Sequence, residues 1–444
     1  MTPPRYSRGL GNVHVSEARA GAVPTLGNNP QRHALGLYAE QLSGTGFTRA
    51  RAANRFVWVY RSLPSVALSS ATEYACVDAE LDVARDARSL RVDPHPGRWA
   101  PPAPPADGRR RDFVQGLRLF GEAGQRELHQ GLAIYQYSLD ADMTRTCASL
   151  CDGDLLLVPQ SGGPLRVRTE LGDVLVAPEE VAVVPAGTRF AVSREDPETR
   201  CTGYAAQCFN EGGFRLPETG LMGPNVLAAP EDFEVPVARE DAPDPEQQWT
   251  HYTQVGGSWF RGALRRGASP FDVAGWKGNL VPFRYSLRKF KTVNTVSFDH
   301  PDPSIFTVLT VPSADGGSAC DLVVFPPRWM VAESTFRPPY FHRNTASEFM
   351  GLISGEYDGK QRGGGFVPGG ASLHSRYTPH GPDVPVHREA VAADLKPVKF
   401  EGGLAFMFET CYLVRVSEWA RAGPHRERTY ASSSWGGFAP AAKL

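Results

Sequence analysis

The chain has 444 residues, with 47 basic and 48 acidic side chains and a formal net charge of −1. This balance, without a long run of like charges, excludes nucleic acid and anionic membrane surfaces as expected partners. No segment approaches the roughly 18 consecutive apolar residues of a membrane-spanning helix. We therefore expect a cytoplasmic protein that acts on a small molecule.

The seven cysteines are scattered along the chain and include no C-x-x-C pair. Such a pair is typical of zinc ribbons and of redox motifs. The pattern predicts reduced thiols, in keeping with a cytoplasmic protein.

Short runs rich in Val, Leu, Phe and Tyr alternate with turns, which use many of the 45 glycines and 38 prolines. In chain order, the clearest runs are 154–159, 165–169, 173–177, 181–185 and 190–192. Each run has the length of a strand and is bounded by turn residues. The sequence therefore predicts a mainly β fold built from sandwiches or barrels.

Three segments interrupt or end this pattern. Residues 100–112 (APPAPPADGRRRD) are rich in proline and then basic, and we interpret them as a surface loop rather than a basic binding site. Residues 229–247 are acidic and proline-rich and indicate a connection between two blocks. After about Val416, residues 418–437 indicate a short helix followed by a loose tail.

The sequence thus divides into a large amino-terminal β-rich domain, residues 1–280, and a smaller domain, residues 281–444. Within the first domain, residues 172–192 follow an order of glycine, strand, Pro-x-Gly turn and strand. This order resembles the second sequence motif of cupins, which are small double-stranded β-helix (jelly-roll) barrels. Phe190 stands where a metal-binding cupin has histidine, so we expect this first barrel to hold no metal.

Five of the eleven histidines fall within residues 300–387, at positions 300, 342, 374, 380 and 387. His342 is followed by Glu348, and neither a helix nor a straight strand brings these two together. Six residues turn about 600° around a helix, and they extend about 20 Å along a strand. The chain must therefore reverse within 343–346, with Asn344 as a candidate turn residue, if both side chains are to face one point.

A third ligand is available downstream, where a Pro-Gly turn precedes His374 and His380. Spacing from Pro368 slightly favours His374. Two imidazoles and one carboxylate with open positions suit a mononuclear Fe(II) site, whereas a structural zinc site would require four protein ligands. A catalytic zinc site stays possible on ligand type alone.

Four longer strings resemble the homogentisate 1,2-dioxygenase family, and the resemblance extends from about Gly11 to about Val416. The strings are residues 28–66, 297–310, 336–357 and 364–383. The family implies ring opening of homogentisate by O₂ to maleylacetoacetate in tyrosine and phenylalanine breakdown. It also implies a cupin-like catalytic domain and a homo-hexamer made of two trimers.

The resemblance also implies a role for each candidate residue. Fe(II) is bound by His342, Glu348 and His380, the acid/base group is His300, Tyr357 and His380 contact the substrate, and His374 lies behind the ligands. Two other classes of cupin fit the sequence less well. A zinc or manganese sugar isomerase would need phosphate-binding basic residues, whereas aromatic residues flank this cluster. A metal-free storage cupin would not retain all three ligands.

Overall fold

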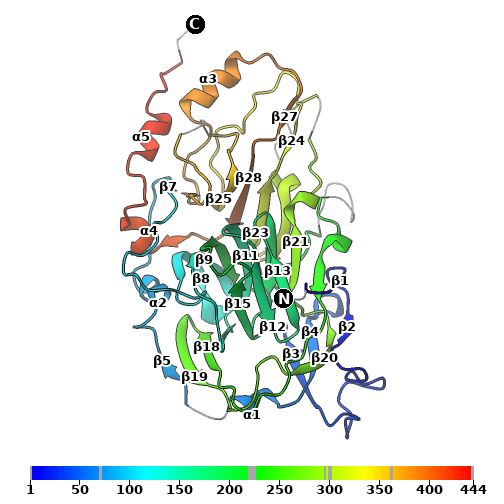
Figure 1. The fold of residues 1–444 in the computed structure, drawn as a ribbon. Coiled ribbons are helices and arrows are strands. Elements are labelled where there is room, and N and C mark those ends of the chain that lie inside the picture. Colours follow the sequence, from blue (N-terminus) through cyan, green and yellow to red (C-terminus); the bar gives the residue numbers. More distant parts are fainter. Residues whose placement is uncertain are drawn as a thin grey trace.

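The computed structural model describes residues 3–69, 73–218, 227–294, 297–298, 303–360 and 364–441. Strands dominate this part of the chain, and Figure 1 shows the carboxyl-terminal helices, in orange and red, at the top and along one side of the molecule. The mainly β fold class predicted from the sequence is confirmed.

Two large sheets build the first barrel. The ten-stranded sheet has the order β1 (Tyr6–Arg8), β17 (Glu234–Pro236), β21 (Phe283–Ser286), β14 (Glu180–Val184), β11 (Asp154–Ser161), β16 (Cys201–Cys208), β9 (Gln130–Leu139), β8 (Leu117–Gln125), β29 (Arg415–Val416) and β6 (Arg91–Val92). The seven-stranded sheet has the order β13 (Gly172–Val176), β12 (Leu165–Thr169), β15 (Phe190–Arg194), β10 (Thr146–Leu150), β18 (Thr250–Val255), β19 (Ser258–Ala263) and β5 (Ala75–Cys76). The five strands predicted from the sequence correspond to β11 to β15.

The surroundings of β11 explain why its residues are continuously apolar and do not alternate between apolar and polar. Successive side chains of a strand point to opposite faces. Leu155 and Leu157 pack into the core shared with the seven-stranded sheet. Leu156 and Val158 pack on the other side, in the core that contains Phe349 of the second half. At β11 the ten-stranded sheet is therefore buried on both faces, with the core of the first barrel on one side and the core that contains Phe349 on the other.

Phe190, the residue at the place of a metal-binding histidine, is fully buried in the first barrel. It is 1% exposed and packs edge-on against Phe113, with ring centroids 6.1 Å apart. Its position is therefore part of the apolar core of this barrel.

The remaining sheets and helices complete the two ends of the molecule. A four-stranded sheet has the order β2 (His14–Glu17), β20 (Val273–Gly278), β4 (Phe56–Arg61) and β3 (Tyr38–Ser43). The six-stranded sheet of the second half has the order β22 (Thr307–Pro312), β23 (Ser318–Phe325), β28 (Gly403–Thr410), β25 (Ser347–Gly355), β26 (Ala371–His374) and β7 (Gly97–Trp99), and β24 (Arg328–Met330) pairs with β27 (Val398–Phe400). The α-helices are α1 (Ser65–Leu68), α2 (Asp82–Ala87), α3 (Val384–Ala392), α4 (Glu418–Ala422) and α5 (Tyr430–Trp435), and the short 3-10 helices are Arg51–Ala53, Arg126–Leu128, Pro230–Asp232, Leu287–Lys289 and Pro303–Phe306.

The two halves exchange strands. β7 comes from the first half but pairs with β26 at the edge of the six-stranded sheet. Conversely, β29 comes from the second half and pairs with β8 and β6 in the ten-stranded sheet. The exchange ties each half of the sequence to the sheet of the other.

Two segments, the connection 229–247 and the carboxyl-terminal tail, are more structured than the sequence indicates. The acidic segment 229–247 contributes β17, which pairs with β1 and β21. The prediction of a loose tail is wrong in part, because α5 lies within the tail and the side chain of Tyr430 is only 1% exposed. Burial of this aromatic side chain against the second half holds the tail in place.

The proline-rich segment 100–112 contains neither helix nor strand, as predicted for a surface loop. Two of its three basic side chains have partners within the protein: Arg110 donates to the backbone carbonyl of Asp140, and Arg111 pairs with Asp107. All seven cysteines are free. No helix among the described ranges has the length and apolarity to cross a bilayer.

Candidate metal centre and its cavity

Three side chains from separate segments converge at one end of the six-stranded sheet. His342 precedes β25, Glu348 lies on β25, and His380 follows β26. Each offers a ligand atom, and these atoms all lie within 4.8 Å of one another. Oε1 of Glu348 is 3.6 Å from Nε2 of His342, and Oε2 is 2.8 Å from Nε2 of His380.

Backbone pairing sets this convergence. His342 and His380 form an isolated antiparallel bridge, in which each N–H donates to the carbonyl of the other at 3.0 and 3.2 Å. His342 therefore lies in a one-residue bridge and not in a regular strand. Glu348 lies beside His374 in the pairing of β25 with β26.

Asn344 produces the predicted chain reversal and also orients the carboxylate. Its Oδ1 accepts a hydrogen bond from the N–H of Ala346, which is an Asx-type turn. Its Nδ2 donates to Oε1 of Glu348 at 2.6 Å. One side chain thus shapes the turn and holds a candidate ligand.

The two histidines present the same nitrogen to the centre. Nδ1 of His342 lies 2.9 Å from the carbonyl of Tyr340, and Nδ1 of His380 lies 2.9 Å from the carbonyl of Thr378. A carbonyl accepts only, so Nδ1 carries the proton and donates in both cases. This leaves both Nε2 atoms, which face Glu348, as the nitrogens available to a metal ion.

The electrostatics of the cluster favour an ionised carboxylate. Burial by itself would raise the pKa of Glu348, but hydrogen bonds with His342 and His380 outweigh it and hold this pKa well below its usual range. The same bond to Glu348 raises the pKa of His342. A buried anion between two imidazoles is suited to a cation.

His374 lies directly behind His380 and outside the group of converging ligand atoms. Their rings stack with centroids 4.1 Å apart and an interplanar angle of 3°. Nε2 of His374 is 3.2 Å from the hydroxyl of Tyr430. Burial, followed by the charge of His380, lowers the pKa of His374 well below its usual value, so a neutral imidazole supports the ring of His380.

The cluster opens into a cavity of about 860 Å³. Tyr357 lines this cavity and packs against Phe325 and Phe366, with ring centroids 5.7 and 6.0 Å away. Phe306 and Phe336 add to its aromatic lining. His300 lies outside the described residues. The walls match the flat, apolar faces of an aromatic ring.

Several lining residues could not be found from sequence spacing. Arg98 comes from β7 in the first half and pairs with Glu427 at 2.6 Å. Lys360 follows Tyr357 shortly along the chain and donates to the carbonyl of Gly381 at 3.0 Å. A single lysine belongs to no spaced motif that a sequence reading could recognise. Arg98 lines this cavity only because β7 pairs with β26 in the sheet of the second half.

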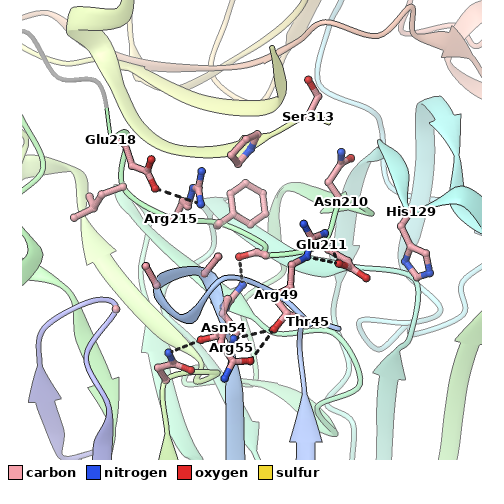
Figure 2. Close-up of a pocket in the computed structure, with 18 of the residues that line it drawn as sticks. Thr45, Arg49, Asn54, Arg55, His129, Asn210, Glu211, Arg215, Glu218 and Ser313 are labelled. Carbon is pink, nitrogen blue, oxygen red and sulfur yellow. Dashed lines mark hydrogen bonds and ion pairs between the residues drawn. The ribbon is translucent and has the colours of Figure 1, made fainter. Parts of the chain in front are cut away.

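A second cavity, of about 630 Å³, is lined mainly by residues of the first half, with Ser313 of the second half at its edge (Figure 2). Its charged groups neutralise one another: Arg49 pairs with Glu211, and Arg215 pairs with Glu218. Thr45 accepts from the backbone N–H of Arg55. No group of three metal-binding side chains from the described ranges lies there, so the histidine cluster is the better candidate for chemistry.

The fold and the cluster define a mainly β protein with a candidate mononuclear metal centre in an aromatic cavity. Comparison with known families narrows this class. The family description "Homogentisate 1,2-dioxygenase N-terminal" matches residues 5–287, and "Homogentisate 1,2-dioxygenase C-terminal" matches residues 288–441. The chain belongs to the homogentisate 1,2-dioxygenase family.

Relatives of nearly full length support this membership. A homogentisate 1,2-dioxygenase of Emericella nidulans is 44% identical and aligns over 98% of this chain and 95% of its own. One from Caenorhabditis elegans is 46% identical over 94% and 93%, respectively. Among solved structures, a putative dioxygenase from Nostoc punctiforme is 12% identical, covers 63% of this chain and 69% of its own, and has a TM-score of 0.29.

Proposed function

We propose that the protein opens the ring of homogentisate, 2,5-dihydroxyphenylacetate, with O₂ to give maleylacetoacetate, at a ferrous ion held by His342, Glu348 and His380. The observation that carries the proposal is the convergence of these three ligand atoms within 4.8 Å, in a chain that belongs to this family over its length. Both atoms of O₂ enter the product, so one O₂ is consumed for each ring opened.

The donor set supports this assignment of the metal. Two imidazoles and one carboxylate form the arrangement used by non-haem Fe(II) oxygenases, with positions left open for substrate and O₂. Bound there, ferrous iron would lower the pKa of a ring hydroxyl and couple the electron-rich ring to O₂. Glu348 would supply the negative charge that favours a cation over a proton in this buried place.

The protein side chains divide the remaining tasks. The aromatic walls around Tyr357 would hold the ring in one plane, and the Tyr357 hydroxyl would donate to a polar substituent. His374 would keep the ring of His380 in place through their stacking. His300 would accept the proton of the ring hydroxyl, since an imidazole has a pKa suited to this transfer near neutral pH.

The experiment is anaerobic reconstitution with Fe(II), followed by O₂ uptake with homogentisate and, separately, with gentisate. We expect one O₂ consumed per homogentisate, with the absorbance of a ring-opened product, and slower or no uptake with gentisate. The matched control is Glu348→Gln, which keeps the shape of the side chain but removes its charge. No uptake by the iron-loaded protein, or full iron content and activity in Glu348→Gln, would contradict the proposal.

Assembly and location belong to the same proposal. We infer a homo-hexamer, formed as a dimer of trimers, that works in the cytoplasm in tyrosine and phenylalanine breakdown. Sedimentation equilibrium of the purified protein measures the assembly, and a mass of one, two or three chains would contradict the hexamer.

A further inference from the structure

Lys360 places an ammonium group in the wall of the metal-centre cavity. Its Nζ donates to the carbonyl of Gly381 at 3.0 Å, and Gly381 directly follows the candidate ligand His380. The same Nζ lies 4.8 Å from the ring centre of Trp435 and 5.5 Å from that of Tyr430. An ammonium group has three donors, and among the described residues its hydrogen-bond partner is this one carbonyl, so it retains further hydrogen-bonding capacity.

Other cations of the cavity lining are already satisfied by the protein. Arg98 pairs with Glu427 at 2.6 Å, and Arg328 pairs with Asp358 at 2.5 Å. Arg337 donates to two backbone carbonyls away from the cluster, and Arg343 is exposed at the rim. In the described part of the chain, no carboxylate oxygen lies within 4.0 Å of Nζ of Lys360.

The surroundings of Lys360 disfavour its charge unless an anion joins it. Burial lowers its pKa to about 8, Asp383 opposes this shift and Arg98 adds to it. A desolvated cation whose neighbours are a carbonyl and two aromatic rings is costly for the fold. A carboxylate brought by a ligand would complete an ion pair for which the described residues offer no carboxylate.

We propose that Lys360 binds the carboxylate of the substrate and so makes the cavity selective for dihydroxyphenyl acids over neutral dihydroxybenzenes. This inference rests on the proposed function. The ammonium group is held by the carbonyl of Gly381, next to the candidate ligand His380, and lines the same cavity. When a ring hydroxyl of the substrate lies at the centre formed by His342, Glu348 and His380, the acetate side chain of that ring can therefore extend towards the ammonium group. Lys360 then fixes which ring edge faces the metal.

The test compares two ligands that share the ring hydroxyls: homogentisate, and 2-methylhydroquinone, which lacks the carboxylate. Dissociation constants are measured for both with Fe(II)-loaded protein under anaerobic conditions, so that binding is separated from turnover. The variants are Lys360→Met and Lys360→Arg, with Lys399→Met as the matched control. Lys399 is exposed on β27, pairs with Glu401 and does not line the cavity.

Lys360→Met should weaken homogentisate binding by about 10- to 100-fold, as loss of a charge-assisted hydrogen bond predicts, with 2-methylhydroquinone changed less than about threefold. Lys360→Arg should restore part of the homogentisate affinity, and Lys399→Met should match the wild type for both ligands. Equal weakening for both ligands, or unchanged homogentisate affinity, would overturn the assignment. Failure of the wild-type protein to consume O₂ with homogentisate would instead overturn the proposed function.

Discussion

Replacing Lys360 with methionine should stabilise the metal-free protein at neutral pH, although it weakens substrate binding. The reason is that the folded protein disfavours the charged form of this lysine. Burial lowers its pKa from 10.5 to about 8. Methionine has a similar length, carries no charge and suits the aromatic contacts with Tyr430 and Trp435.

The size and pH dependence of this effect follow from the two pKa values. Below pH 8 the lysine is charged in both the folded and the unfolded protein, so the whole penalty on the folded state is present. As pH rises from 8 towards 10.5, the folded state loses its proton first, and the penalty falls. The shift corresponds to about 3 kcal/mol, and partial exposure of Lys360 with loss of its bond to Gly381 reduces the net gain to about 1–2 kcal/mol.

The assay is urea unfolding of iron-free wild type, Lys360→Met and Lys399→Met at pH 7 and pH 10, followed by tryptophan fluorescence. We expect the Lys360→Met midpoint to exceed that of wild type at pH 7 and to lose most of this advantage at pH 10. The Lys399→Met variant should follow the wild type at both pH values. If Lys360→Met is no more stable at pH 7, or if its advantage does not change with pH, the desolvation argument is wrong.

Three further predictions test the fold and the site. Arg61 is fully buried and bonded to Asp272 at 2.6 Å and to Glu170 at 3.1 Å; Arg61→Met should cost about 3–5 kcal/mol, because two carboxylates lose their partner, and an unchanged urea midpoint would refute this. His300→Ala should keep its iron, measured by metal analysis, yet lose most of its turnover, and an unchanged rate would remove His300 from the acid/base role. Tyr357→Phe should raise KM for homogentisate by about tenfold through loss of one hydrogen bond; identical steady-state kinetics would show that its hydroxyl does not touch the substrate.

Local sequence signals predicted much of the fold correctly. The strands β11 to β15 match apolar runs bounded by turns, because strand length and turn chemistry are properties of neighbouring residues. The reversal between His342 and Glu348 followed from the dimensions of helix and strand, and Asn344 is its turn residue. In these places a short stretch of chain contains all the interactions that decide its structure.

The assignment between His374 and His380 shows where spacing fails. Counting from the preceding Pro-Gly turn slightly favours His374, yet His374 ends β26 and stacks behind the cluster. His380 reaches the centre because its backbone pairs with His342 across a bridge. Resemblance to a family indicated His380, whereas the spacing of residues could not.

The sequence by itself determined the mainly β class and the positions of many strands, and it indicated His342 and Glu348 as candidate ligands, since these depend on local periodicity and on residue type. Only the tertiary structure decided that β7 would join the sheet of the other half, that the tail would fold as α5 around a buried Tyr430, and that Lys360 would face the cavity. Each of these depends on contacts between distant parts of the chain, whose free energy exists only once the sheets have packed, and no local pattern encodes such a pairing.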